Sequence, residues 1–435
     1  MRFGTDGVRG RANTELTPRF ALDLGRAAAK VLGASVAVVG GDSRRSTPML
    51  EAAFVAGLAS EGVEVHRLGV TPTPAVAFEA VRIGAMGAVV SASHNPYHDN
   101  GIKLFAVGGT KLADEVEAQI EQALADLGPH TVEPAPIHGR GDTGEAYVDH
   151  LLSILEGRDL GGLRIVVDAA NGAASHLAAE VFTRSGAQVV VINDQPDGIN
   201  INARCGATDT EGLRAVVVAE RAHAGIALDG DADRLIAVDE RGDVVDGDHV
   251  IAICAADLQR RGALRDDTVV VTVMTNLGFR LAMDRAGIRV VETAVGDRYV
   301  LEALAAGRYS LGGEQSGHVI FSDHATTGDG MLTALAVLDI VQRSGRPLSE
   351  LATQAMTKLP QVLVNVRVAD RTADVTALAA TEIAAAEAEL GSTGRVLIRP
   401  SGTEPLIRVM VEAATAGQAT AVAQRLADVI ERLCA

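Results

Sequence analysis

Aromatic residues and cysteines are scarce in this chain of 435 residues. Aromatic side chains make up 3% of it and tryptophan is absent, so the core must be built mainly from Ala, Val, Leu and Ile. The three cysteines, Cys205, Cys254 and Cys434, are far apart and form no C-x-x-C pair. This spacing excludes a disulfide framework and a cysteine-based zinc site.

Long apolar runs are also missing. No stretch reaches the uninterrupted apolar length that a membrane span needs, and the first residues, MRFGTDGVRG, lack the apolar segment of a secretory signal. We therefore expect a cytoplasmic protein without a membrane partner.

Positively charged residues are fewer than negatively charged ones, because the formal net charge is -17 at pH 7. This balance argues against a nucleic-acid partner, and an anionic substrate would need local Arg or Lys side chains to enter.

The residues that are present indicate an α/β protein. Apolar content of 47% and charged content of 22% are ordinary for a globular chain, and the length suits about three domains. Val-rich stretches alternate with Ala/Leu-rich ones, and three segments repeat the order strand, polar loop, helix, glycine, strand. These segments lie at 36–65, 164–192 and 269–292. They predict three related α/β domains with mixed sheets.

After about residue 360 the pattern changes. A strand at 362–368, an Ala/Glu-rich helix, strands at 395–399 and 406–411 and a closing helix at 418–433 predict a smaller C-terminal α+β domain. Polar and Pro/Gly-rich stretches then place the domains at 1–140, 141–242, 243–355 and 356–435.

The segment GAVVSASHNPYHDNGIK, residues 87–103, is the first candidate site. Its short apolar run predicts a buried strand, and Pro96 and Asn100-Gly101 predict a loop after it. Ser93 then follows a strand end, where open α/β sheets carry chemistry, with His94 beside it and Lys103 near. A hydroxyl there is a candidate nucleophile or phosphate carrier.

Two other interpretations of this segment are open. A turn without chemistry suits the local composition equally well. A serine-hydrolase nucleophile is disfavoured, because Ala92 and His94-Asn95 replace the glycines of the G-x-S-x-G elbow.

Three alternating carboxylates, Asp229, Asp231 and Asp233, form the second candidate site. Such close carboxylates repel one another, and a divalent cation removes the conflict. All-oxygen ligands select magnesium or calcium. A calcium loop of the helix-loop-helix type matches at these positions and at Glu240, but Arg234 stands where that loop needs glycine and the flanks predict strands. Magnesium is therefore the prediction, and a solvated acidic turn is the alternative.

Two glycine-rich segments are weaker candidates. In the start RFGTDGVRGRA, Thr5 and Arg9 could be presented to an anion, although a polar terminus is the simpler interpretation. In GGEQSGH, residues 312–318, Glu314 and Ser316 could bind sugar hydroxyls, although a structural turn explains the motif equally well in isolation.

The segment RPSGTEP, residues 399–405, could form a phosphate cradle. Arg399 and Arg408 bracket a Ser-Gly-Thr turn whose N–H groups and hydroxyls can surround an oxyanion. The motif is not a Walker A loop, because the G-K-[ST] helix start is missing. An ordinary hairpin turn is the alternative.

In this order and spacing, SASHNP, DGDADR, GEQSGH and RPSGTEP resemble the motifs of the α-D-phosphohexomutase family. The likeness extends from Phe3 to Arg408. The start FGTDGVRG, GEQSGH and VGDRYV at 295–300 are most similar to the phosphoglucosamine branch of that family. The family implies three related α/β domains and a C-terminal domain of a different fold around a central cleft, with the fourth domain mobile.

The resemblance also implies an activity. Phosphorylated Ser93 would transfer its phosphoryl group to glucosamine 6-phosphate, giving glucosamine 1,6-bisphosphate, and the 6-phosphate would then return to Ser93 and leave glucosamine 1-phosphate. That product would supply UDP-N-acetylglucosamine and cell-wall precursor synthesis. The substrate is a small sugar phosphate, and a homodimer is one expectation.

The resemblance gives each matching residue a role. One magnesium ion per chain would be held by the phosphate on Ser93 and by Asp229, Asp231 and Asp233. Glu314 and Ser316 would bind sugar hydroxyls. The non-transferring phosphate would be bound by Arg399, Ser401, Gly402, Thr403 and Arg408. Arg9 or Arg234 would offset charge, His94 and Lys103 would handle protons, and Thr5, Asp297 and Arg298 would support the site.

Two rival functions are weighed against this one. A mutase of the same family could act on glucose or mannose phosphates. A protein of a different class, a calcium-binding sugar-phosphate sensor without enzymatic activity, would share the acidic loop but carry no phosphate on Ser93.

Overall fold

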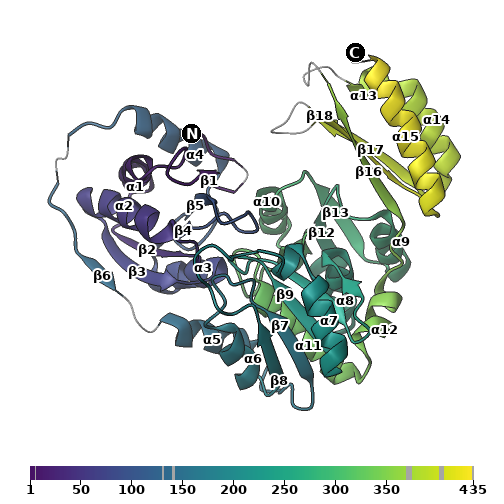
Figure 1. Cartoon of the computed structure of the whole chain (residues 1–435), viewed down its shortest axis with the longest axis horizontal. Coiled ribbons are helices and arrows are strands. Elements are labelled where there is room, and N and C mark those ends of the chain that lie inside the picture. The colour runs from purple at the N-terminus through teal and green to yellow at the C-terminus, as the bar shows by residue number, and fades with distance from the viewer. Residues whose placement is uncertain (5, 130–131, 140–142, 369–374, 401–405, 434–435) are drawn as a thin grey trace. The chain divides into compact units, whose positions relative to one another are not determined.

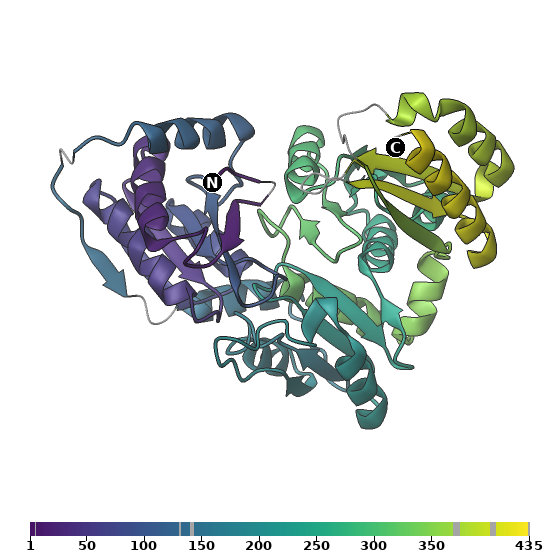
Figure 2. The same ribbon diagram turned by 45° about the horizontal axis from the view of Figure 1, so that its top comes forward.

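The computed structural model describes residues 1–4, 6–129, 132–139, 143–368, 375–400 and 406–433. The chain forms two compact units. Unit 1 comprises Met1–Met274 with Ile288–Ala355, and unit 2 comprises Thr275–Gly287 with Met356–Ala435. Four separate β-sheets, drawn in Figures 1 and 2, organise them.

The first sheet of unit 1 has six strands in the order β1-β5-β4-β2-β3-β6. Its strands are β1 (Val8–Arg11), β2 (Val36–Gly41), β3 (Glu64–Val70), β4 (Met86–Val90), β5 (Asp99–Phe105) and β6 (Ile137–Gly139). The four strands β4-β2-β3-β6 are parallel, whereas β5 runs antiparallel to β4 and the edge strand β1 runs antiparallel to β5. Helices α1 (Pro18–Leu32), α2 (Thr47–Ser60), α3 (Thr73–Ile83) and α4 (Asp114–Ala125) accompany this sheet.

Helices cover both faces of this sheet (Figure 1). Val39 and Val90 pack with α1, α2 and α4, while their neighbours Val38 and Val89 pack with α3. Adjacent strand residues point to opposite faces, so a strand buried on both sides is apolar throughout. Helix α1 contributes one of the faces that cover the sheet. Thr17 caps it by accepting a hydrogen bond from the Phe20 amide, at 3.2 Å.

The second and third sheets of unit 1 repeat this plan. The second, in the order β11-β10-β9-β7-β8, is formed by β7 (Arg164–Asp168), β8 (Gln188–Ile192), β9 (Ala224–Leu228), β10 (Leu235–Asp239) and β11 (Val244–Val245), with α5 (Thr143–Ser153), α6 (Ala178–Arg184) and α7 (Glu211–Glu220). The third, in the order β13-β12-β14-β15, is formed by β12 (Thr268–Thr272), β13 (Arg289–Thr293), β14 (Leu311–Gly313) and β15 (Val319–Phe321), with α8 (Gly247–Arg260), α10 (Asp297–Gly307), α11 (Gly330–Ser344) and α12 (Leu348–Ala355). Each has parallel central strands and an antiparallel edge, which confirms the predicted mixed sheets.

Unit 2 is smaller and has an antiparallel sheet in the order β16-β18-β17. It consists of β16 (Gln361–Arg367), β17 (Arg395–Pro400), β18 (Leu406–Glu412), α13 (Val375–Leu378), α14 (Ala380–Leu390) and α15 (Ala416–Leu433). Ile407, Val409 and Val411 pack against α14 and α15 on one face of this sheet (Figure 1). The predicted C-terminal α+β domain is therefore confirmed.

Helix α9 (Leu277–Ala286) belongs to unit 2, although its sequence lies within the segment predicted as the third domain. Its first turn is bound by Glu412, whose carboxylate is fully buried. Glu412 accepts hydrogen bonds from the Leu277 amide at 2.9 Å and from Asn276 Nδ2 at 3.1 Å, and it pairs with Arg395 Nε at 2.8 Å. The four domain boundaries stay predictions, and the one at 140/141 falls outside the described residues.

The loop predicted at Asn100 and Gly101 was wrong, because both residues lie inside β5. A Cβ on Gly101 would come within 2.6 Å of the Ser91 carbonyl oxygen, so this glycine permits a close approach of two backbone segments rather than a turn. The Asn100 amide is buried and donates to Ser46 Oγ at 2.9 Å. Tertiary contacts have replaced the turn that this dipeptide usually forms.

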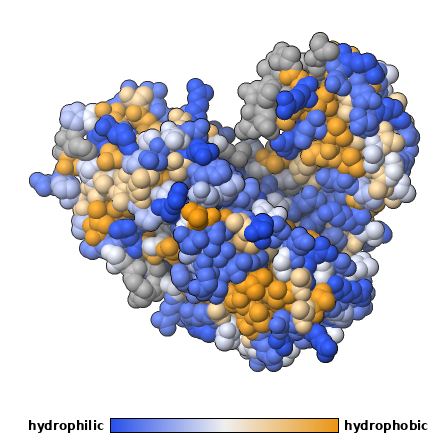
Figure 3. All heavy atoms as spheres, viewed as in Figure 1, coloured by the Kyte–Doolittle hydropathy of each residue, from blue (hydrophilic) through white to orange (hydrophobic). Residues whose placement is uncertain are grey.

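The surface mixes hydrophilic and apolar side chains, and the visible face in Figure 3 shows apolar patches separated by hydrophilic residues. In the part of the chain that the structure describes, no helix is long and apolar enough to cross a membrane.

Candidate active site

The predicted phosphoserine and metal motifs meet in unit 1. Ser93 lies three positions after the end of β4, and Asp229 follows β9 directly. Although 136 positions separate them in the sequence, Ser93 Oγ donates a hydrogen bond to Asp229 Oδ2 at 2.5 Å. Both side chains are fully buried. The two loops therefore form one site at the carboxyl ends of strands from two different sheets, as expected for open α/β folds.

The acidic motif is the turn of the hairpin β9–β10. Carboxylate oxygens of Asp229, Asp231 and Asp233, one from each, lie within 4.8 Å of one another, close enough to hold one metal ion. The predicted convergence is thus confirmed. Because strands rather than helices flank the turn, the helix-loop-helix calcium template does not apply.

The charges of this triad fit a bound cation. Burial, together with Asp233 and Asp231, raises the pKa of Asp229 well above its usual range. One oxygen each of Asp231 and Asp233, both named Oδ1, is buried without a hydrogen-bond partner. A divalent cation would satisfy these oxygens and offset the repulsion. Carboxylates as the sole side-chain donors suit magnesium.

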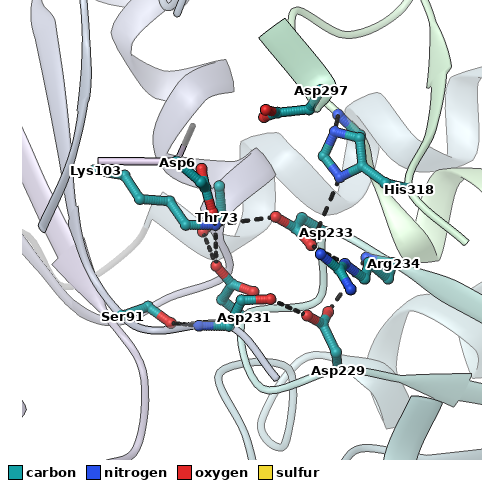
Figure 4. Close-up of polar contacts among 12 residues, drawn as sticks. Asp6, Thr73, Ser91, Lys103, Asp229, Asp231, Asp233, Arg234, Asp297 and His318 are labelled. Carbon is teal, nitrogen blue, oxygen red and sulfur yellow. Dashed lines mark hydrogen bonds and ion pairs between the residues drawn. The ribbon is translucent and has the colours of Figure 1, made fainter. Parts of the chain in front are cut away.

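The Lys103 ammonium group lies against two carboxylates of the triad, those of Asp231 and Asp233 (Figure 4). Its Nζ lies 2.8 Å from Asp231 Oδ2, 3.0 Å from Asp233 Oδ2 and 2.9 Å from Asp6 Oδ2. Burial alone would lower the pKa of Lys103, but these three carboxylates together raise it well above its usual range. Lys103 therefore stays charged and balances the triad. Its predicted role as a proton handler stays a prediction, and this geometry favours a charge-balancing role.

The same lysine and His318 also act on Asp233. Burial would raise the pKa of Asp233, but Lys103 and His318 outweigh it and hold that pKa well below its usual range. His318 Nδ1 lies 3.7 Å from Asp233 Oδ1. Asp229 and Asp233 therefore differ in proton affinity although they lie in one loop.

His94 lies beside the Ser93 hydroxyl, with its Nδ1 3.3 Å from Ser93 Oγ. Burial, helped by Arg234 and Arg9, lowers the pKa of His94 to about 4. The imidazole is therefore neutral at pH 7, and a neutral ring can accept a proton. This geometry supports the predicted role of His94.

Two arginines add positive charge near the loop that carries Ser93, residues 91–96, which is called the phosphoserine loop below. Arg9 Nη1 donates to the Ala92 carbonyl at 3.4 Å, and its other terminal nitrogen pairs with Asp6. Arg234 follows the triad directly, and its Nε lies 3.7 Å from Asp233 Oδ1. Thr5, which was predicted beside Arg9, lies outside the described residues.

The predicted sugar motif lies directly against the acidic hairpin. The Leu235 amide of β10 donates to the Gly317 carbonyl at 2.9 Å, and Gly317 has φ +91°, with no space for a Cβ next to the Leu235 carbonyl. Within the motif, Ser316 Oγ donates to Glu314 Oε2 at 3.3 Å, and the Gly296 amide donates to Glu314 Oε1 at 3.1 Å. The structure therefore brings Glu314 and Ser316 next to the triad.

Asp297 and Arg298 begin α10 and have different partners. Asp297 pairs with Lys111, which also lies 3.3 Å from Asp6. Arg298 pairs with Asp114, and with Glu117 at 2.6 Å, both in α4. These contacts tie α10 to α4 and show no interaction of Arg298 with Ser93 or the triad.

The predicted phosphate motif lies in unit 2. Arg399 of β17 and Arg408 of β18 are directly opposite each other, on the face that α14 and α15 leave uncovered. Burial and Arg408 lower the pKa of Arg399. Like charges in this position destabilise a sheet, and an anion between them would relieve the repulsion. Ser401, Gly402 and Thr403 lie outside the described residues.

The sequence singled out Ser93 but not Arg44, which holds the backbone of Ser93. Ser93 has a left-handed backbone, with φ +50°, a conformation that costs a residue other than glycine about 1–2 kcal/mol. Arg44, fully buried and paired with Asp42, donates from Nη2 to the Ser93 carbonyl at 3.0 Å and stabilises this turn. Arg44 follows β2, the parallel neighbour of β4, and this adjacency was a usable signal.

Thr73 is a second residue that the sequence did not single out. Its hydroxyl donates to Asp231 Oδ2 at 2.6 Å, and its amide donates to the Asp231 carbonyl at 3.0 Å. Thr73 begins α3, whereas Asp231 lies 158 positions later in the chain. No local pattern in the sequence connects the two.

A multidomain α/β fold in which a buried serine hydroxyl meets three carboxylates able to hold a metal ion, beside several cations, is typical of an enzyme of the phosphoryl-transfer class. Comparison with known proteins gives the family. The models for the four domains described as phosphoglucomutase/phosphomannomutase match residues 1–129 (alpha/beta/alpha domain I), 145–242 (domain II), 246–359 (domain III) and 363–429 (C-terminal domain). The chain belongs to the phosphoglucomutase/phosphomannomutase family.

Close relatives cover almost the whole chain. A protein of Thermobifida fusca named phosphoglucosamine mutase is 56% identical over 439 residues, which are 98% of this chain and 97% of the relative. A protein of Frankia casuarinae with the same name is 56% identical over 452 residues, with the same coverage of 98% and 97%.

Solved structures share the fold. A phosphoglucomutase/phosphomannomutase family protein of Burkholderia thailandensis is 24% identical with a TM-score of 0.82, covering 99% of this chain and 98% of that one. N-acetylphosphoglucosamine mutase of Aspergillus fumigatus, solved with GlcNAc-6P and magnesium, is 20% identical with a TM-score of 0.73, covering 100% and 96%.

Proposed function

We propose that this protein is a phosphoglucosamine mutase, which interconverts glucosamine 6-phosphate and glucosamine 1-phosphate through phosphorylated Ser93. The hydrogen bond between Ser93 Oγ and Asp229 carries the proposal, because it joins the group that would be phosphorylated to the carboxylates that would hold the metal. The names of the relatives that are 56% identical over nearly the full chain give the substrate.

The transfer is written in two balanced steps. In the first, the bond between Ser93 Oγ and phosphorus breaks, a bond from phosphorus to O1 of glucosamine 6-phosphate forms, and the proton of that hydroxyl passes to Oγ by way of a base. In the second, after the bisphosphate has turned over in the site, the bond between O6 and phosphorus breaks and a bond from phosphorus to Ser93 Oγ forms. The Oγ proton passes to O6 by way of a base, so that glucosamine 1-phosphate is left. His94 is the candidate for the proton transfer at Oγ, since its neutral Nδ1 lies 3.3 Å away.

The other predicted residues have supporting roles in this proposal. Bound magnesium, one ion per chain, would offset negative charge on the phosphoryl group, and its ligands would be Asp229, Asp231 and Asp233. Lys103 would balance the charge of Asp231 and Asp233 and hold these two carboxylates in place. Glu314 and Ser316 would orient the sugar, and Arg399 and Arg408 would bind the phosphate that is not transferred.

Ser93→Ala tests this route. We expect complete loss of turnover of glucosamine 6-phosphate, and intact-mass measurement should show one phosphoryl group on the wild type and none on the variant. Ser153→Ala is the control, because the Ser153 hydroxyl is exposed and bonds only the nearby His150 carbonyl. Turnover by the Ser93 variant would contradict the proposal.

Comparison of sugars tests the substrate. Glucosamine, glucose and mannose 6-phosphates should be assayed side by side, and we expect glucosamine 6-phosphate to give the highest kcat/KM. A strong preference for a hexose phosphate would instead assign a mutase of the same family. Tight calcium binding with no phosphate on Ser93 and no turnover would assign a sensor.

A further inference from the structure

Two carbonyl oxygens of the phosphoserine loop are each bound from two sides. Arg44, in the loop after β2 of the same sheet, donates from Nη2 to the carbonyls of Ser93 and Asn95. Asn202, in the segment after β8 of the five-stranded sheet, donates from Nδ2 to the same two oxygens, at 2.9 and 3.3 Å. Some of the hydrogen bonds that hold this loop therefore come from a segment that follows a strand of a different sheet.

Asn202 is itself held in place. Its amide donates to the Ala170 carbonyl at 3.0 Å, and its φ of +56° is a left-handed conformation that asparagine tolerates better than most residues. The acidic motif passes close to Asn202 at Gly230. A Cβ on Gly230 would lie 2.6 Å from the Ser93 carbonyl oxygen and 2.8 Å from Asn202 Nδ2. Three segments thus meet at one point, with no space for another side chain.

This contact bears on the reacting group through the backbone of Ser93. The Ser93 carbonyl and its side chain are attached to one Cα, so a backbone shift that frees the carbonyl also moves the Cα that carries the side chain. In the observed conformation Oγ lies 2.5 Å from Asp229 Oδ2. Fixing the carbonyl from two directions therefore constrains the Cα from which the side chain bearing Oγ projects, and the hydrogen bond to Asp229 then orients Oγ. Misplacement of a reacting group by about 1 Å can reduce a rate by about 100-fold.

We propose that Asn202 is a positioning residue for the phosphoryl transfer of Ser93. It holds the Ser93 carbonyl while Oγ points toward the acidic triad. The geometry of the phosphoserine loop therefore depends on the position of the segment that carries Asn202, which follows β8 of the five-stranded sheet. The inference rests on the proposed function. The side chain of Asn202 donates to main-chain carbonyls and not to the sugar motif. Its substitution should therefore lower kcat and leave substrate binding unchanged.

The test is Asn202→Asp in the full chain with magnesium. Aspartate keeps the shape and tolerates the left-handed backbone, but it places an acceptor where the two carbonyls need a donor. We expect kcat for glucosamine 6-phosphate to fall by about 10- to 100-fold, with KM changed by less than about twofold. Asn202→Ala should lose less, because Arg44 still binds both carbonyls.

Asn200→Asp is the matched control. It makes the same chemical change two positions away, where the Asn200 side-chain amide donates only to the Gln195 carbonyl of its own loop. We expect wild-type kcat and KM from it. If the Asn202→Asp chain does not fold, Asn202→Ala carries the same measurements, since it removes the donor without adding charge.

A crystal structure of the Asn202 variant separates this inference from the proposed function. We expect Ser93 to leave the left-handed region, or Oγ to leave hydrogen-bond distance of Asp229, whatever the substrate is. An unchanged Ser93 with wild-type kcat would overturn the inference. Absence of turnover in the wild type and in the Asn200 control, with Ser93 still displaced in the variant, would overturn the proposed function alone.

Discussion

Two regions of this molecule collect charge, and they differ in how that charge is balanced. In unit 1, Asp229, Asp231 and Asp233 are buried together, and the Lys103 ammonium lies against two of them. In unit 2, Arg399 and Arg408 are directly opposite each other across two strands. In the first region a cation lies against the carboxylates, whereas in the second two like charges are adjacent. Removing a cation should therefore have opposite effects on stability in the two regions.

The largest effect is expected from Lys103→Met. This change leaves buried carboxylates without their cation, which typically costs about 3–5 kcal/mol of unfolding free energy. Urea unfolding with and without magnesium measures it, and magnesium should restore more stability to the variant than it adds to the wild type. Lys30→Met is the control, because Lys30 is exposed and 3.8 Å from Glu61. Equal losses in the two variants would contradict a balanced triad.

The next effect concerns pH and His94. Its pKa is about 4 in the folded chain, below its usual 6.5, because of burial and then Arg234 and Arg9. The unfolded chain therefore takes up the proton first as pH falls from 6.5 to about 4, and stability is lost in that window. We expect a loss of roughly 2 kcal/mol after allowance for solvent screening. His94→Gln should lack this loss in urea unfolding of the dephosphorylated, metal-free protein; parallel pH curves would refute it.

A smaller effect is expected at the contact between Thr73 and Asp231. Thr73→Val removes the hydroxyl that orients a triad carboxylate, and such supporting changes weaken metal binding by about 10- to 100-fold. Calorimetric titration with magnesium in the absence of substrate measures the loss. Thr73→Ser keeps the hydroxyl and should bind magnesium nearly as the wild type does. Weakened binding in Thr73→Ser with unchanged binding in Thr73→Val would show that the methyl packing, not the hydrogen bond, matters.

The smallest change in stability is expected in unit 2, and it has the opposite sign. Arg399→Gln removes one of two facing like charges and should raise the unfolding free energy by about 0.2–1 kcal/mol in phosphate-free buffer. The same variant should raise KM for the sugar phosphate. Arg395→Gln, in the same strand, should destabilise, because Arg395 pairs with the buried Glu412. A destabilised Arg399 variant would remove the contrast between the two regions.

Much of the fold and part of the site could be predicted from local sequence. Strand ends follow from apolar runs, and so Ser93 and Asp229 were placed correctly in loops after β4 and β9. Alternation made the three aspartates converge. Asn100-Gly101 was misassigned because its turn preference is local, whereas the close passage of Ser91 beside Gly101 is not. Arg298 was predicted to support the site, and only the structure shows its partners in α4.

The sequence alone determined the alternation of strands and helices, the burial of the strands and the chemical character of each loop, because these depend on residues close together along the chain. Only the tertiary structure decided that Lys103 pairs with Asp231 and Asp233, that Thr73 orients Asp231 and that Asn202 binds the Ser93 carbonyl. Each of these contacts joins segments more than 100 positions apart. Such pairings depend on how the sheets of unit 1 dock, and no local pattern of residues records that docking.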